Sequence, residues 1–542
     1  MKPSARTALA LGLILLVYAA LFARTRRFDF VWADFDAIRD SPVYDLPLGQ
    51  ELRTTEHARM NASLLELRGI VPLHESYRPL LILSHGLDIE LFGRVPGPMH
   101  VVNVLWGALA ILAAFWLAAR LFAAPEPALL VAAIFAWHPL HVEPICFISS
   151  RGDPMAGALA LVAAALVVEM APAGRAARGG GARLGLAAAA GLTMLLSLFT
   201  KEASVLMPVV LLGFGLATGR LRAWGAGIAA TAAAVPAYAA LRAVLVAHAP
   251  AATHANRVVQ AVLALPAIVT EYARSFLLPF DMSISRPLYV PLALGWAVLA
   301  LLMAIYLLAL RRAPASWRPD VALSAAGVAC AGLLFAPSAI AVFSEDAVAD
   351  RYAYLPLFGF AVALVALGTR AARSRPLRRW AAGFAAVFVV LCVFVTAREI
   401  PAWASSGALY AHAVDVEPQS AAAHSSLGRW LGETGVWADA VTEFEKAAAL
   451  PDAADRVLNN LGASYLHVGR PREAEAALRR ALDRSHGSNF HAWYNLGTAQ
   501  RALGQDAASC LSYRRALAIV PDYAHARADL TRYCPGPPAP AP

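Results

Sequence analysis

Up to about residue 400, the sequence is a succession of apolar runs joined by short, basic connectors. A helix needs about 20 apolar residues to cross the hydrocarbon core of a bilayer. About eleven runs approach that length, near residues 8–22, 100–119, 127–143, 154–171, 184–200, 203–219, 223–247, 290–310, 321–342, 352–369 and 380–397. Charged residues make up only 15% of the chain, against about 25% in soluble domains. We therefore expect an all-α, polytopic membrane bundle, and not a soluble enzyme or a disordered protein.

The basic connectors predict how this bundle is oriented. If the N-terminus is cytoplasmic and each run crosses once, arginine-rich connectors such as residues 370–379 lie in the cytoplasm, as the positive-inside rule requires. Segment 257–280, which Pro266, Glu271 and Arg274 interrupt, must then stay outside as an interfacial or re-entrant segment. The first run resembles a signal-peptide core, but no clear cleavage site follows it, so we expect an uncleaved helix. The count gives eleven spans with the C-terminal domain outside. The Ala- and Arg-rich composition indicates a bacterium, so we expect the bundle in the inner membrane and the C-terminal domain in the periplasm.

The C-terminal part of the sequence is a repeat. Leu-Gly pairs begin at Leu427, Leu461 and Leu496, which are 34 and 35 residues apart. This is the period of tetratricopeptide (TPR) repeats, in which each unit is a pair of helices. Aromatic side chains at signature positions are expected in the repeat core, namely Tyr465, Trp493 and Tyr513. Stacked helix pairs of this kind form extended binding surfaces, so a protein or peptide partner is expected there.

These patterns predict the domain boundaries. The membrane domain is expected at residues 1–400, with a large outer loop at 23–99, and the TPR α-solenoid at 401–534, with about three repeats, capping helices near 403–416 and 523–532, and a disordered Pro/Ala tail at 535–542. Cys510 and Cys534 lie 24 residues apart near the end of the solenoid. They either form a disulfide on the outer side of the membrane or remain two inert thiols.

Ionisable residues gather on the predicted outer side in four separate segments. These segments contain Asp34, Asp36, Asp40, Arg78, His85 and Asp88; then His138, His141, Glu143, Arg151 and Asp153; then Lys201 and Glu202; and finally Glu345, Asp346, Asp350 and Arg351. Ionisable residues at membrane depth are costly and usually functional. A carboxylate can deprotonate a hydroxyl group, and Arg and Lys can neutralise a phosphate. Together they predict glycosyl transfer from a lipid-linked phosphosugar to a hydroxyl acceptor.

Several motifs resemble those of one family. The first loop resembles the W-D-D…I…N-P-x-V pattern of the transmembrane-and-TPR O-mannosyltransferases and their bacterial relatives, which have the C-type glycosyltransferase fold. The resemblance continues, in order, in YRPLLILSHGLD, MHVVN, WHPLHVEPICFISSRGD, FTKEASVLMP and DRYAYLP, over most of residues 28–360. It implies a glycosyltransferase that uses a polyprenyl-phosphate-linked sugar and acts on a protein.

The resemblance assigns a role to Asp34. This residue matches the second acid of the W-D-D pair, which makes it the candidate general base. The first acid of the family pattern is Ala33 here. Asp36 is a possible substitute for the missing acid, but it lies two residues further on. A mechanism that needs both carboxylates is therefore in question.

The other candidate residues are expected to bind the donor or shape its pocket. Lys201 and Arg351 are candidates for the donor phosphate, and the remaining substrate-binding candidates are Arg78, His138, His141 and Glu143. Two alternatives stay open. Lys201 can be an interfacial lysine whose stem lies along apolar surface, and Arg351 can form a structural ion pair with Glu345, Asp346 or Asp350.

Metal and cofactor sites are not expected. Asp34-x-Asp36 has the form of a DxD metal site, and His138 and His141 have the form of a ligand pair. However, the family is metal-independent, and histidines at a helix end more often bond to a neighbour or a phosphate. None of the five cysteines has a zinc-site spacing. The lipid-linked phosphosugar is then the donor substrate, and nucleic acid is not expected as a partner.

The sequence thus predicts a periplasm-facing glycosyltransferase that modifies a Ser or Thr of an exported protein, which the TPR domain recruits. Two other functions stay open. Because Ala33 replaces the first acid of the family pattern, the chain can instead be a catalytically impaired, membrane-anchored TPR scaffold for envelope protein assembly. A lipid or sugar transporter is the other possibility, although the two halves of the membrane domain show no internal inverted repeat.

Overall fold

The computed structural model describes residues 4–41, 78–171, 179–245, 254–280, 290–345, 349–451 and 453–534. Within these ranges the regular structure is entirely helical. The chain divides into two compact units, one ending at Ser405 and one beginning at Ser406. The predicted Pro/Ala tail at 535–542 and residues 42–77 of the predicted outer loop lie outside the described residues.

The first unit contains the predicted membrane helices. In the described part of the chain, eight helices are long and apolar enough to cross a membrane. They are α1 (Ala5–Phe22), α4 (Pro96–Phe122), α7 (Gly152–Glu169), α8 (Gly180–Thr200), α10 (Leu221–Leu245), α12 (Leu292–Arg312), α13 (Arg318–Glu345) and α15 (Arg375–Glu399). The predicted all-α membrane bundle is therefore confirmed.

The other three predicted spans lie on bent or shorter helices. Helix α5 (Pro125–Trp137) is followed by a 3-10 turn and α6 (Val142–Cys146), and the pair is bent by 56°, so that it counts as one further span if it crosses as a unit. Apolar helices α9 (Met207–Ala217) and α14 (Pro356–Ala372) are shorter. Each of these breaks is at or next to a proline, which cannot donate a backbone hydrogen bond and so favours a helix start.

The interrupted segment 257–280 forms one helix, α11 (His254–Leu277), which is not among the candidate spans. It packs closely on α12, because a Cβ added at Gly295 would overlap the backbone of Ala267. The ring of Tyr272 stacks on Phe335 of α13, with 4.3 Å between the ring centroids. The interfacial or re-entrant placement of α11 stays a prediction.

Glycines also allow close contact between α13 and α14. A Cβ at Gly327 of α13 would lie 2.7 Å from the carbonyl oxygen of Gly359 in α14, and a Cβ at Gly359 would lie 2.6 Å from the amide nitrogen of Ala331. Lipid provides no hydrophobic force between helices, so small residues that permit backbone approach are the usual basis of such contacts.

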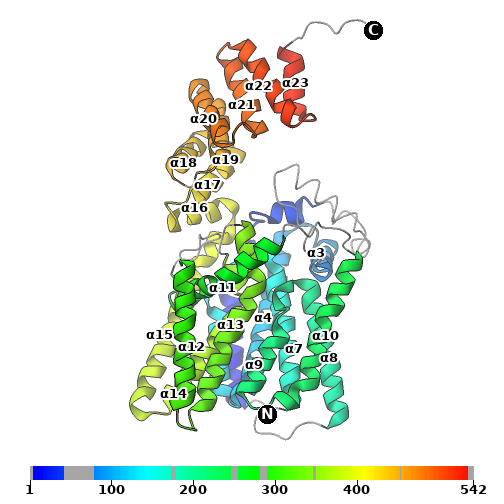
Figure 1. Cartoon of the computed structure of the whole chain (residues 1–542), viewed down its shortest axis with the longest axis vertical. Coiled ribbons are helices and arrows are strands. Elements are labelled where there is room, and N and C mark those ends of the chain that lie inside the picture. The colour runs from blue at the N-terminus through cyan, green and yellow to red at the C-terminus, as the bar shows by residue number, and fades with distance from the viewer. Residues whose placement is uncertain are drawn as a thin grey trace. The chain divides into compact units, whose positions relative to one another are not determined.

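The second unit is built from paired helices (Figure 1). They are α16 (Ser406–Val416), α17 (Ala421–Glu433), α18 (Trp437–Ala449), α19 (Asp455–His467), α20 (Pro471–Arg484), α21 (Phe490–Ala502), α22 (Asp506–Ile519) and α23 (Ala524–Tyr533). The glycine of each Leu-Gly pair lies against a large side chain of its partner helix. A Cβ would lie 3.2 Å from Phe444 at Gly428, 2.5 Å from Leu478 at Gly462 and 2.6 Å from Tyr513 at Gly497. The absence of a side chain at these glycines therefore explains the Leu-Gly signature.

The aromatic positions of the repeat are core positions. Tyr465 and Tyr513 are 8% and 0% exposed, and the partly buried Trp493 packs against the repeat core. The first capping helix begins later than predicted, because Ser405 is extended and separates a 3-10 turn (Ile400–Ala404) from α16. Trp403 therefore belongs to the first unit, where its ring lies 5.7 Å from that of Phe147.

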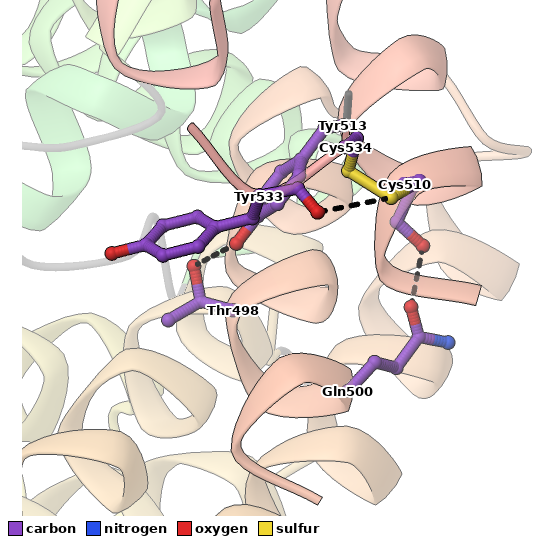
Figure 2. The surroundings of a disulfide bond; sticks show 7 residues. Thr498, Gln500, Cys510, Tyr513, Tyr533 and Cys534 are labelled. Carbon is purple, nitrogen blue, oxygen red and sulfur yellow. Dashed lines mark hydrogen bonds between the residues drawn. A yellow bond between two sulfur atoms is a disulfide. The ribbon is translucent and has the colours of Figure 1, made fainter. Parts of the chain in front are cut away.

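A disulfide closes the end of the solenoid. Figure 2 shows Cys510 of α22 bonded to Cys534, which follows α23, with their Cα atoms 5.7 Å apart. Of the two possibilities left open by the sequence, the structure has the disulfide. In the same region the Ser512 hydroxyl and the Gln500 amide oxygen are 2.7 Å apart. The bond therefore ties the last helix to the last complete repeat.

Candidate active site

The candidate residues lie on turns and helix ends of the first unit. These are a π-helical turn (Phe35–Arg39) and the residues before it, α3 (Pro79–Phe92), the 3-10 turns Pro139–His141 and Ile148–Arg151 on either side of α6, the junction between α8 and the turn Glu202–Ser204, and the turn Asp350–Ala353. Helix α3 lies at the end of the bundle opposite the amino terminus (Figure 1). Helix ends leave backbone groups unpaired and side chains unpacked, which is why polar groups concentrate in such places.

Three ion pairs join these segments. Lys201 Nζ lies 2.5 Å from Asp153 Oδ1, and Arg351 Nη1 lies 2.7 Å from Glu143 Oε1. Arg78 Nε lies 3.2 Å from Glu202 Oε2. The pairs connect residues that are far apart in the sequence, so they hold the separate outer segments against one another.

The three cations form one cluster. Burial lowers the pKa of Lys201, the charge of Asp153 raises it, and the charges of Arg78 and Arg351 lower it further. The ring of Tyr352 lies between two of them, with its centroid 5.7 Å from Lys201 Nζ and 4.9 Å from Arg351 Cζ. The structure thus brings together three predicted substrate-binding cations, which we call the cation cluster.

Asp34 is completely buried and held by hydrogen bonds. Its Oδ1 accepts from the backbone N–H of Ser149 at 2.7 Å and from the Ser149 hydroxyl at 2.6 Å. Its Oδ2 accepts from the Val31 N–H at 3.2 Å. Burial raises the pKa of Asp34 to about 6, although the hydrogen bonds from Ser149 oppose this rise. A carboxyl group with this pKa is ionised near neutral pH and is basic enough to act as a general base.

Trp32 connects Asp34 to the cation cluster. Its ring stacks on Phe147 at 5.3 Å and lies 5.6 Å from Arg351 Cζ. Its backbone φ is +51°, in the left-handed region that bulky residues rarely adopt. Such strain persists only where the surroundings impose it and is common at functional sites. The candidate base and the candidate phosphate ligands therefore belong to one packed assembly.

The two histidines have a different environment. His138 Nε2 bonds to the carbonyl oxygen of Phe276 at 2.9 Å, and His141 Nε2 bonds to that of Tyr354 at 3.1 Å. Each histidine ring also stacks on the ring of the residue to which it bonds. The centroids are 5.2 Å apart for His138 and Phe276 and 4.2 Å apart for His141 and Tyr354. These contacts anchor the bend after α5. Among the described residues, no group of three or more His, Cys, Asp or Glu side chains is arranged to hold a metal ion.

Some residues have contacts that the sequence did not predict. Arg351 pairs with Glu143, which was not among the acids considered for it, and the side chains of Glu345 and Asp346, two of those acids, lie outside the described residues. The side chain of Asp36 also lies outside them. Ser149 carries no charge, so nothing in its sequence context marked it as a partner of Asp34.

Arg151 is the most deeply buried cation of the site. It is 0% exposed, and it bonds to Asn103 Oδ1 at 2.7 Å, to the Met99 carbonyl at 3.0 Å and to the Ser84 hydroxyl at 3.0 Å. Its Nη2 lies 2.5 Å from Asp88 Oδ2. It therefore joins α3, α4 and the turn before α7. The ionisable character of Arg151 was visible in the sequence, whereas this network was not.

Comparison with known proteins identifies a repeat family and a set of enzyme relatives. A tetratricopeptide-repeat family model matches residues 455–485 and 490–523. Among curated proteins, the chain is 34% identical over 164 residues to mouse (Mus musculus) protein O-mannosyl-transferase TMTC1, covering 30% of this chain and 16% of that protein. The curated homologues of this chain are protein O-mannosyl-transferases. The family resemblance predicted from the motifs is therefore confirmed.

Two further relatives give the same result. The chain is 29% identical over 152 residues to mouse protein O-mannosyl-transferase TMTC3, covering 28% of this chain and 16% of that protein. It is 32% identical over 149 residues to human (Homo sapiens) protein O-mannosyl-transferase TMTC4, covering 24% of this chain and 19% of that protein. The similarity thus spans less than a fifth of the length of these relatives.

Proposed function

We propose that this chain is a membrane glycosyltransferase that moves a sugar from a polyprenyl-phosphate-linked donor to a Ser or Thr hydroxyl of an exported protein. The main support is that the segment carrying Asp34 reaches the cation cluster through Trp32, whose ring lies 5.6 Å from Arg351 Cζ, while Asp34 itself bonds to Ser149. A candidate base and three candidate phosphate ligands are then available to one reaction. The relatives named as protein O-mannosyl-transferases support the same reaction class.

The proposed reaction needs one base and a stabilised leaving group. Asp34 accepts the proton of the acceptor hydroxyl, whose oxygen forms a bond to the anomeric carbon of the donor sugar. The bond between that carbon and the phosphate oxygen breaks, and polyprenyl phosphate leaves with the electron pair. Arg351, Lys201 and Arg78 neutralise the phosphate charge, as cations placed where negative charge develops do in many transferases. No divalent cation takes part in this proposal.

The scaffold function has one observation in its favour, which is Ala33 at the position of the first family acid. Asp34 is then the acid that remains of the family pair. Sugar transfer by the purified chain distinguishes the two functions, because a scaffold would bind partners without modifying them.

The direct test is transfer with the purified full chain in lipid nanodiscs. A polyprenyl-phosphate hexose and a Ser/Thr-rich peptide are supplied, and mass spectrometry detects a hexose on the peptide. We expect transfer that persists in EDTA. Absence of product over a range of hexoses and peptides would favour the scaffold, and loss of product in EDTA would contradict the metal-free mechanism.

Replacement of Arg351 by Gln is expected to weaken donor binding. A hydrogen bond to a charged group contributes roughly 1.5–3 kcal/mol, so the KM for the donor should rise about 10- to 100-fold, with a smaller change in the KM for the acceptor peptide. Arg373→Gln is the matched control, because Arg373 is exposed and pairs with Asp320. Equal donor KM values for the two variants would argue against phosphate binding by Arg351.

We also infer that the N-terminus is cytoplasmic and that the TPR unit is periplasmic, in a bacterial inner membrane. Disulfides such as Cys510–Cys534 persist in oxidising compartments. In addition, several connector arginines lie at the helix ends away from the candidate site. Arg120 at the end of α4 lies 2.6 Å from Glu169 at the end of α7, whereas the starts of both helices lie near Arg151.

Protease protection tests this orientation. Protease added to intact spheroplasts is expected to remove the TPR unit, and a thiol reagent should label Cys510 and Cys534 only after reduction. Protection of the TPR unit, or labelling without reduction, would place it in the cytoplasm. A periplasmic TPR unit would have the acceptor protein on its own side of the membrane, and its extended surface is suited to bind that protein.

A further inference from the structure

One short segment contacts four separate residues of the candidate site. In residues 147–153, alternate residues reach different partners: Phe147 stacks on Trp32, Ser149 bonds to Asp34, Arg151 pairs with Asp88, and Asp153 pairs with Lys201. Three of these contacts have a clear electrostatic or apolar basis. The contact of Ser149 is different, because a neutral side chain and its own backbone N–H both donate to one carboxylate oxygen.

We propose that Ser149 is a positioning residue that holds the Asp34 carboxylate in its reactive orientation and keeps it ionised. This inference rests on the proposed function, in which Asp34 is the base. The argument is geometric: both Ser149 bonds to Oδ1 are short, at 2.7 and 2.6 Å, and two donors on one oxygen restrict rotation of the carboxylate. Hydrogen bonds to the charged form of an acid favour that form.

The need for such donors follows from burial. Asp34 is 0% exposed, and burial alone raises the pKa of a carboxyl group, because the charge loses its hydration. The N–H and hydroxyl of Ser149 lower the pKa of Asp34, as do the backbone N–H groups of Val31 and Ile148 to a smaller extent. Without the hydroxyl, Asp34 would be protonated over a wider pH range and inactive as a base there.

The stretch of chain that carries Asp34 packs through Phe30 and Ile38 against Met99 of α4, Ile89 of α3 and Ile148. The titratable groups on these and adjoining elements are His85, Asp88, Glu90 and Arg94 on α3 and its end, His100 on α4, Glu143 on α6, Arg151 before α7 and Arg351; those on the same stretch as Asp34 are Asp29, Arg39 and Asp40. Asp88 and Glu143 are paired with arginines, and burial holds the pKa of His85 well below its usual value. Replacement of Ser149 leaves all of these groups in place. A change in the titration midpoint of Asp34 can therefore be attributed to loss of the Ser149–Asp34 contact.

The test uses the full chain with Ser149→Ala, Ser149→Thr and Ser150→Ala. Threonine keeps the hydroxyl, and Ser150 is a buried neighbouring serine with no role in the proposed site. The first measurement is the infrared carbonyl band of protonated Asp34, obtained by difference against Asp34→Asn and titrated with pH. The second is the pH profile of sugar transfer.

In the unsubstituted chain the band is expected to titrate near pH 6. Loss of one bond to a charged group should raise the midpoint by about one pH unit in Ser149→Ala. Transfer should then be about tenfold slower at pH 5 and within about twofold at pH 8.5. Ser149→Thr should restore both readouts, and Ser150→Ala should change neither.

The outcomes separate the two proposals. An unchanged midpoint in Ser149→Ala, or an equal shift in Ser150→Ala, would overturn the role of Ser149. A shifted midpoint in a chain that transfers no sugar at any pH would support the contact and overturn the proposed function. A rate that falls equally at all pH values while the midpoint stays unchanged would show a merely structural effect and would also overturn the inference.

Discussion

Replacement of Asp34 by Asn is expected to lower sugar transfer by about 10²- to 10⁴-fold, the usual contribution of a general base. Asn retains a carbonyl oxygen that can accept the Ser149 bonds, so the local fold should persist, but it cannot take the acceptor proton. In the unsubstituted chain the rate should fall as the pH drops through about 6, because protonation of Asp34 removes the base.

The same substitution should not lower the thermal unfolding midpoint at pH 7 to 8. The folded-state pKa of Asp34 is raised from the usual 3.8 to about 6, so its contribution to stability is present at low pH and is lost as the pH rises through 6. Above that pH the buried charge opposes folding by up to about 3 kcal/mol, and Asn removes it.

Asp40→Asn is the matched control for this experiment. Asp40 lies in the same segment but is exposed and pairs with its neighbour Arg39, so its replacement should leave the rate within about twofold, as is usual for surface ion pairs. Full activity of Asp34→Asn would show that another group is the base. The role that the first-loop resemblance assigns to Asp34 would then be wrong.

Replacement of Arg151 by Met is expected to destabilise the membrane unit by about 3–5 kcal/mol, the cost of removing one partner of a buried ion pair. The side chain is 0% exposed and has Asp88, Asn103 and a backbone carbonyl as partners. Met fills a similar volume but leaves the carboxylate of Asp88 without a counter-charge. The measurement is the thermal unfolding midpoint of the purified chain in one detergent, compared with unsubstituted protein.

Two further variants test the cause of the destabilisation expected for Arg151→Met. Asp88→Asn combined with Arg151→Met removes the uncompensated charge and should recover part of the lost stability. Arg373→Met removes an exposed partner of Asp320 and should cost no more than about 1 kcal/mol. Equal destabilisation by Arg151→Met and Arg373→Met would mean that the buried network does not hold the three segments together.

Much of the fold could be predicted because its signals are local. Apolar runs of membrane-spanning length predicted the helical bundle, and the repeated Leu-Gly pairs predicted the TPR unit, since each signal reports a requirement within one helix or one helix pair. Breaks were harder to locate. The bend after Trp137 lies next to Pro139, and the extended Ser405 follows a turn that contains Pro401, but a proline marks only a place where a helix can break, and packing by other segments decides where the chain turns.

The candidate site was predicted only in part. The charges of Asp34, Lys201 and Arg351 marked them as unusual in a membrane protein, and the family resemblance suggested their roles. Their partners were not predictable, because Lys201 had Glu202 beside it in sequence and yet pairs with Asp153, and Arg351 has Asp350 beside it and yet pairs with Glu143.

The amino-acid sequence alone determined the helical membrane architecture, the repeat and the set of ionisable residues, because periodicity and charge are properties of neighbouring residues. Only the tertiary structure decided which acid meets which cation, that Ser149 donates to Asp34, and that Cys510 bonds to Cys534. These pairings depend on how helix ends far apart in the chain come together, and a buried charge takes as its partner whichever group that packing brings within hydrogen-bonding distance.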